Sequence, residues 1–104
     1  MFDWFKEAAI KKGMSNIRND TEKLIEVANM AESRVSLTGY LHALDTVKLK
    51  RMQDNLARNI RWAITVEVPT IEITNQIQSV LVRVHASETA MIALDEVSRN
   101  LFRR

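Results

Sequence analysis

The feature that most constrains the fold of this chain is a run of residues near the C-terminus, mostly apolar, whose spacing alternates between four and three. Over four heptads this spacing places one seam along a single helix, and such a helix buries its seam against a neighbouring helix. Pro69 suits the first turn of a helix, so the pattern predicts one helix over residues 69–102, about 50 Å long at 1.5 Å per residue. The seam consists of Ile73, Ile77, Val80, Val84, Ser87, Met91, Leu94, Ser98 and Leu101.

The N-terminal segment predicts a short amphipathic helix over residues 2–12. Phe2, Trp4 and Phe5 fall on one side at about 100° per residue, while most of the charged side chains take the other. Gly13 suits the left-handed position that follows a helix end, so we expect the helix to stop there.

Two longer helices are predicted between this segment and the C-terminal helix. One begins between Ser15 and Asp20 and ends near Gly39, with a helix continuing through Gly39 as the alternative, and the next covers about 40–64. Residues 64–73 alternate in polarity and are rich in β-branched side chains, so a short strand pair is an alternative there. We favour a helix end and a turn, because a proline disfavours helical geometry at the residue before it.

These elements predict an all-α protein with a short N-terminal amphipathic helix and three longer helices in an elongated bundle with coiled-coil-like packing. The 104 residues contain two Gly and one Pro, which leave few places to turn. We expect one helical domain over 1–104, in which 1–13 form the amphipathic helix and 14–104 the bundle.

The composition indicates the cellular compartment in which we expect the chain. There is no cysteine, so disulfides and thiolate metal sites are excluded. No apolar run approaches the roughly 20 residues that cross a bilayer, and no signal-peptide pattern precedes the helices. We expect a cytoplasmic protein, with peripheral attachment to a membrane as an alternative.

The length of the predicted last helix favours self-association. A helix of about 50 Å exceeds what a neighbour of about 24 residues covers, which leaves apolar positions near its C-terminal end without a partner. We expect a homo-oligomer, most simply a dimer, with a different protein as the alternative partner. The predicted interface residues are Ile73, Ile77, Val80, Val84, Met91, Leu94, Val97, Leu101 and Phe102.

The aromatic residues Phe2, Trp4 and Phe5 are the predicted attachment element. With Lys6 and Lys11 near the edges of the apolar side, the segment has a composition suited to a membrane interface. The alternatives are that it folds back on the bundle, covers a second protomer, or docks on another protein.

Charge is distributed unevenly along the chain. Residues 48–61 contain five cations and Asp54, or 5 − 1 = +4, and residues 62–98 contain Arg83 and five acids, or 1 − 5 = −4. Solvated helix faces that attract one another explain both clusters. Contact with nucleic acid is the alternative, although aromatic side chains that stack on bases are missing from the basic face. That face consists of Lys50, Arg51, Arg58 and Arg61.

Candidates for chemistry are few. His42 with Asp45 and His85 with Glu88 are spaced i, i+3 and would share a helix face, as metal ligands in bundles do. In an antiparallel hairpin the two pairs would lie roughly 10 Å apart along the axis, too far to hold one ion. No nucleophile motif or phosphate loop is present, so we predict no catalytic residue, no metal and no cofactor.

The sequence therefore predicts a non-enzymatic helical assembly or adaptor protein that acts through protein contacts. A membrane-surface scaffold and a non-specific nucleic-acid-binding accessory protein are the alternatives.

Two families resemble this chain in layout alone. An amphipathic helix before a long helical hairpin is similar to the phage-shock family of membrane-remodelling scaffold proteins, but no motif of that family occurs here. The size resembles that of small helical secretion substrates with a Trp-x-Gly turn, but Trp62 is followed by Ala63 and Ile64, so the glycine is missing. Neither family is assigned.

Overall fold

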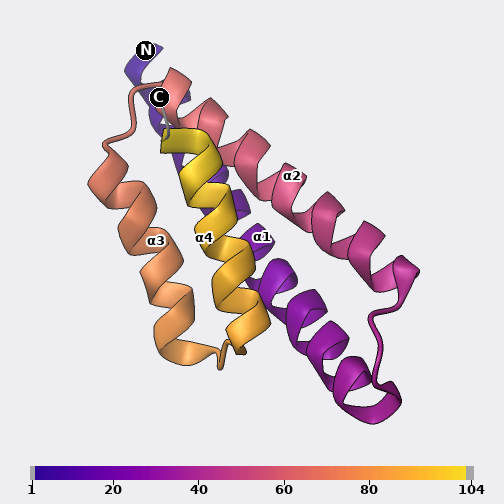
Figure 1. Cartoon of the computed structure of the whole chain (residues 1–104). Helices are drawn as coiled ribbons and strands as arrows, with labels where there is room; N and C mark the ends of the chain where they lie inside the picture. The colour runs from indigo at the N-terminus through magenta and orange to yellow at the C-terminus, as the bar shows by residue number, and fades with distance from the viewer. Residues whose placement is uncertain (1, 103–104) are drawn as a thin grey trace.

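The computed structural model describes residues 2–102, and the side chains of residues 4–101 among them. Helices account for 88% of the described residues, and no strand occurs among them, which confirms the all-α fold class. The elements are α1 (Phe2–Thr38), α2 (Ala43–Thr65), α3 (Thr70–Arg83) and α4 (Glu88–Phe102), as Figure 1 shows.

The first helix is long, so the prediction of a short helix ending at Gly13 is wrong. α1 runs without a break from Phe2 to Thr38. Gly13 lies inside it because its bare backbone makes room for the ring of Trp62 on α2. A glycine that suits a helix end can equally mark a close approach by another element.

The helix end near Gly39 is confirmed. Gly39 has a φ of +82°, the left-handed conformation that glycine adopts without strain, and its N–H donates to the carbonyl of Val35 at 2.7 Å. α2 then begins at Ala43 and returns along α1.

The turn predicted around Pro69 is confirmed, and the described part of this region contains no strand. Val68 N–H donates to the carbonyl of Ala63 at 3.0 Å, and Glu67 takes a positive φ of 67°. α3 starts directly after Pro69, whose fixed φ suits a helix start.

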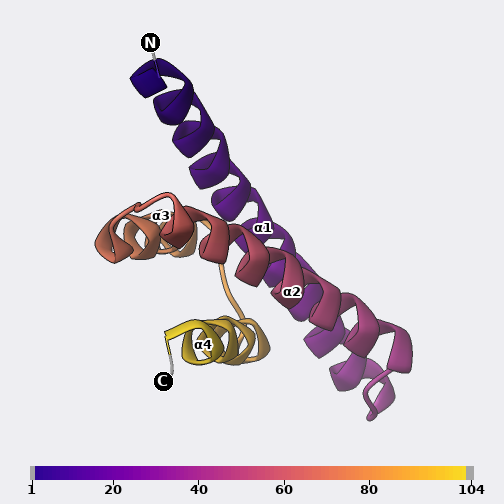
Figure 2. The same ribbon diagram turned by 90° about the horizontal axis from the view of Figure 1, so that it is seen from above.

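α1 is the helix on which the other three gather. It contacts the other three helices, and α2 contacts both α3 and α4, whereas the backbones of α3 and α4 lie apart (Figure 2), with no pair of Cα atoms within 8 Å. The molecule is elongated, with extents of 56 × 30 × 20 Å. The largest fully buried apolar side chains are Ile17, Leu24, Ile25, Leu56, Ile60, Ile73 and Val80.

The prediction of a single helix over 69–102 is also wrong. The chain leaves α3 at Val84, whose φ of −119° and ψ of 126° are extended, and α4 starts at Glu88. The break is stabilised by side chains of α1, as described below. It also lets α4 bury the small residues Ala90 and Ala93, whereas the seam residue Met91 is 47% exposed.

Candidate interaction surfaces

The N-terminal end of α1 exposes an aromatic pair. The rings of Trp4 and Phe5 meet edge to face with centroids 4.8 Å apart, and the two residues are 66% and 63% exposed. At about 100° per residue, Trp4 lies roughly 140° around the helix from the core residue Ile17, so the continuous helix turns it away from the bundle. We call Trp4 and Phe5 the aromatic tip; the side chain of the third predicted attachment residue, Phe2, lies outside the described side chains.

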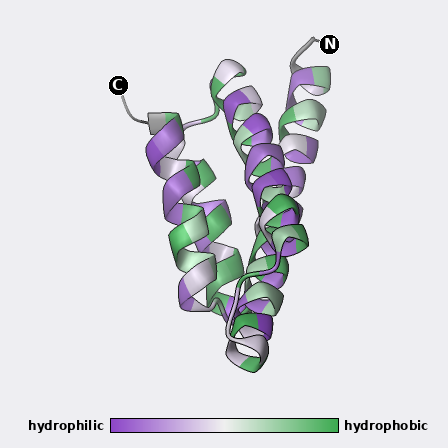
Figure 3. Ribbon diagram, turned by 45° about the vertical axis from the view of Figure 1, so that its right-hand side comes forward, coloured by the Kyte–Doolittle hydropathy of each residue, from purple (hydrophilic) through white to green (hydrophobic). Residues whose placement is uncertain are grey.

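A second exposed apolar surface lies at the opposite end of α1. It combines the last turn of α1, the connection and the first turns of α2, and Figure 3 shows hydrophobic residues in this part of the molecule. No periodic signal predicts this surface, because the helix ends before Gly39 and the apolar residues on either side of the break belong to different elements. This hairpin-end patch consists of Leu37, Tyr40, Leu41, Leu44 and Val47.

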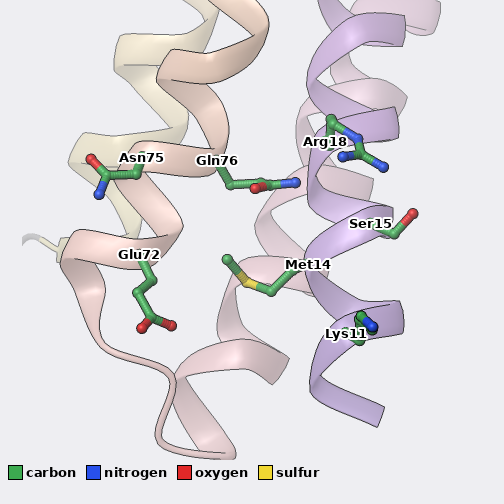
Figure 4. A pocket seen from close by; sticks show the side chains of 7 residues that line it. All are labelled: Lys11, Met14, Ser15, Arg18, Glu72, Asn75 and Gln76. Atoms are coloured by element: carbon green, nitrogen blue, oxygen red, sulfur yellow. The ribbon is translucent and has the colours of Figure 1, made fainter. Parts of the chain in front are cut away.

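An open groove separates α1 from α3 (Figure 4). It has a volume of about 630 Å³, and Met14 and Gln76 extend into the space between the two helices. Lys11 and Arg18 line the α1 side, and Glu72 lines the α3 side. Its lining mixes both signs of charge with an apolar side chain, so it is not specific for one ligand chemistry.

The predicted interface residues divide by burial. Ile73, Val80, Leu94 and Val97 are buried within the chain itself. Others pack against this core with part of their surface free, namely Ile77, Val84 and Leu101, and Met91 is exposed. The side chain of Phe102 lies outside the described side chains.

The predicted basic face is on the surface of α2. Lys50, Arg51, Arg58 and Arg61 are all exposed. Lys50 forms an ion pair with Asp54 at 3.3 Å, which weakens the positive field in the middle of the face.

The histidine pairs do not form a site. His42 precedes α2, where its Nε2 lies 3.4 Å from Thr38 Oγ1, while Asp45 is buried and pairs with Arg34 at 2.9 Å. His85 is exposed in the connection between α3 and α4. Among the described residues no three His, Asp or Glu side chains lie close enough to hold a metal ion.

A polar cluster joins α1 to the connection between α3 and α4. Asn29 Nδ2 donates to the carbonyl of His85, and Asn29 Oδ1 accepts from the N–H of Ser87, both at 2.9 Å. Glu32 Oε2 accepts from the N–H of Thr89 at 3.1 Å. We call Asn29 and Glu32 the turn clamp.

The clamp places a carboxylate at the start of α4. The N–H of Thr89 is the main cause that lowers the pKa of Glu32, with smaller contributions from the hydroxyls of Thr89 and Ser87 and from His85. Ser87 Oγ also accepts from the N–H of Ala90 at 3.2 Å, as a helix cap does. Ser87 was thus a helix-start signal within the predicted continuous helix.

Within residues 2–102 no helix combines the length and the apolar character that a bilayer crossing requires. No protein-family model, no curated protein and no solved structure matches this chain.

Proposed function

We propose that this chain is a non-enzymatic helical assembly protein that associates with a second copy of itself and uses the aromatic tip as an attachment element. The observation that carries the proposal is the exposure of Trp4 and Phe5 at the projecting end of α1. Large apolar side chains that face solvent together mark binding surfaces.

The aromatic tip offers enough apolar area to drive docking. Trp and Phe bury roughly 150–250 Å² each, and at about 25 cal/mol per Å² the exposed part of this pair contributes on the order of 5 kcal/mol before ordering costs. Tryptophan is among the residues that contribute most to protein interfaces. The backbone of this segment is already helical, so docking fixes few additional dihedral angles.

Charge favours a protein partner over a lipid surface. Residues 2–12 contain three lysines and two acids, or 3 − 2 = +1, which gives weak attraction to anionic lipid. The membrane-surface scaffold is the second candidate, since Trp4 and Phe5 sit beside lysines on a projecting helix.

One variant separates the two candidates. Trp4→Ala with Phe5→Ala should lower the mass of the wild-type oligomer, measured by light scattering without lipid, while the helical circular dichroism is retained. If the tip serves a membrane, the oligomer mass stays unchanged and sedimentation with anionic vesicles is lost instead. A variant equal to the wild type in both assays contradicts a role for the tip. Ile71→Ala with Val82→Ala, two exposed residues of α3, is the matched control.

A further inference from the structure

The connection between α3 and α4, residues 84–87, is held bent by side chains of α1, with the cap from Ser87 as its one local signal. It contains neither Gly nor Pro, and the four-three spacing continues through it. The turn clamp fixes the backbone of this connection, because Asn29 donates a hydrogen bond to the carbonyl of His85 and accepts one from the N–H of Ser87. We call residues 84–87 the α3–α4 turn.

The clamp is compatible only with the bent form. In a continuous helix the N–H of Thr89 would donate to the carbonyl of His85, four residues earlier. In the structure that N–H donates to Glu32, and the N–H of Ser87, which would donate to the carbonyl of Arg83 in a continuous helix, donates to Asn29. The bonds of the clamp and the bonds of a straight helix therefore exclude one another.

The buried faces of α3 and α4 do not coincide on a straight helix. Ile73 and Val80 face the core from α3, and Ala90 and Val97 from α4. At 100° per residue the two faces point about 100° apart. Straightening therefore removes α4 from its place against α1 and α2, and no close backbone contact between α3 and α4 opposes this, since no pair of their Cα atoms lies within 8 Å.

We propose that two copies of this chain exchange α4, with the α3–α4 turn straightened so that α3 and α4 become one helix. The proposal rests on the proposed self-association and supplies a second contact between the copies, beside the one made by the aromatic tip. In the exchanged dimer α4 occupies the same site on α1 and α2 of the other copy, so the native contacts re-form between chains and cost little. One such contact joins Gln53 Nε2 to the carbonyl of Ala93 and to Glu96 Oε2, each at 3.0 Å.

The exchange also gives the unbroken seam a role. Val84, Ser87 and Met91 lie on one stripe of the straight helix, at the point where the two long helices of the dimer cross. In the bent form this stripe is incompletely covered, because Val84 and Ser87 are half-buried and Met91 is exposed.

Crosslinking tests the exchange directly, since the chain has no cysteine of its own. Gln53→Cys and Glu96→Cys are made as separate single variants of the full chain, one of them isotopically labelled, and are unfolded, mixed, refolded and treated with a short thiol-to-thiol crosslinker. Exchange predicts a crosslinked pair with one chain of each kind, joined between positions 53 and 96. A dimer without this crosslink overturns the exchange and leaves self-association standing, whereas a chain that is monomeric at every concentration overturns both.

Variants of the clamp and of the turn should shift the midpoint concentration of dimerisation in opposite directions. Asn29→Ala removes two hydrogen bonds that only the bent form makes, so the concentration at the midpoint of dimerisation should fall about tenfold. His85→Gly with Ala86→Gly disfavours a helix through the turn and should raise that concentration by a similar factor. Equal shifts in the same direction would overturn the proposal, because they would show general destabilisation.

Two surface charges complete the test. Met91→Glu introduces a charge where the long helices cross and should weaken dimerisation, while the unfolding curve of the monomer changes little because Met91 is 47% exposed. Val82→Glu is the matched control, since Val82 is 87% exposed and lies about 180° from Met91 on the straight helix. A Met91→Glu protein that dimerises as well as Val82→Glu overturns the proposed crossing point.

Discussion

The indole ring of Trp62 on α2 lies against the backbone of Gly13 on α1, so close that a Cβ atom on residue 13 would be 2.0 Å from Cζ3 of the ring. A glycine inside a helix is about 1 kcal/mol less favourable than alanine. Here that cost is offset by a contact between the two longest helices of the bundle. Gly13 therefore marks where α2 packs on α1.

Gly13→Ala should destabilise the protein by about 1–2 kcal/mol, even though alanine favours a helix, because the indole must leave its position or the helices must separate. The free energy of unfolding in urea, followed by circular dichroism at fixed protein concentration, measures the change. In a Trp62→Leu background the same substitution should be neutral or stabilising by up to about 1 kcal/mol. If Gly13→Ala stabilised the protein with Trp62 in place, the proposed role of the contact between Gly13 and Trp62 would be contradicted.

The Gly13 contact also shows what the sequence could not predict. Periodicity identified the helices around it, because apolar spacing reports the face that a helix buries. It did not reveal that an aromatic side chain 49 positions away needs the space above Gly13. A glycine read in isolation favours a helix end, which was correct at Gly39 and wrong at Gly13.

The α3–α4 turn was missed for a similar reason. The seam from Ile73 to Leu101 has the spacing of one helix, and only Ser87 before Glu88 indicated a new start. The deciding groups, Asn29 and Glu32, belong to a helix whose contacts with the turn span 56 to 58 positions of the chain. The aromatic residues near the N-terminus were predicted as an attachment element. That they face away from the core could be inferred only once α1 was known to be continuous.

The buried ion pair near the connection of α1 and α2 should respond unequally to loss of its two partners. The Asp45 side chain is 5% exposed and that of Arg34 is 42% exposed, and neither paired atom makes a further hydrogen bond. Arg34→Met leaves a buried carboxylate without its counter-charge and should cost about 2–3 kcal/mol. Asp45→Asn leaves the partly hydrated guanidinium of Arg34 without a partner. It should lower the free energy of unfolding by about 1 kcal/mol less than Arg34→Met does.

Urea unfolding of both variants measures this asymmetry. Lys50→Met is the matched control, because its pair with Asp54 is exposed on both sides and should contribute less than about 1 kcal/mol. An Asp45→Asn protein less stable than Arg34→Met would show that Asp45 acts through the start of α2 rather than through Arg34.

The turn clamp should make stability depend on pH. The hydrogen bond from the N–H of Thr89 holds the pKa of Glu32 below its usual range, so the folded state favours the charged carboxylate. The resulting stabilisation is complete above the ordinary glutamate pKa of about 4.3 and is lost as the pH falls through the lower value of the folded state. Glu32→Gln should therefore be less stable than the wild type at pH 7, with the difference shrinking below about pH 4.

Thermal or urea unfolding of both proteins between neutral and acidic pH provides the comparison. Glu26→Gln, an exposed residue of the same helix, controls for the general loss of one negative charge. If the Glu32→Gln difference were constant over the whole range, ionisation of Glu32 would play no part in the clamp.

The mass of the full chain in solution tests the central proposal, self-association, most directly. Light scattering or sedimentation equilibrium over a wide concentration series should show a transition from the chain mass of 12.0 kDa to twice that value, and Asn29→Ala should complete it at lower concentration. A mass that stays at 12.0 kDa at every concentration, for the wild type and for Asn29→Ala alike, would contradict the proposal.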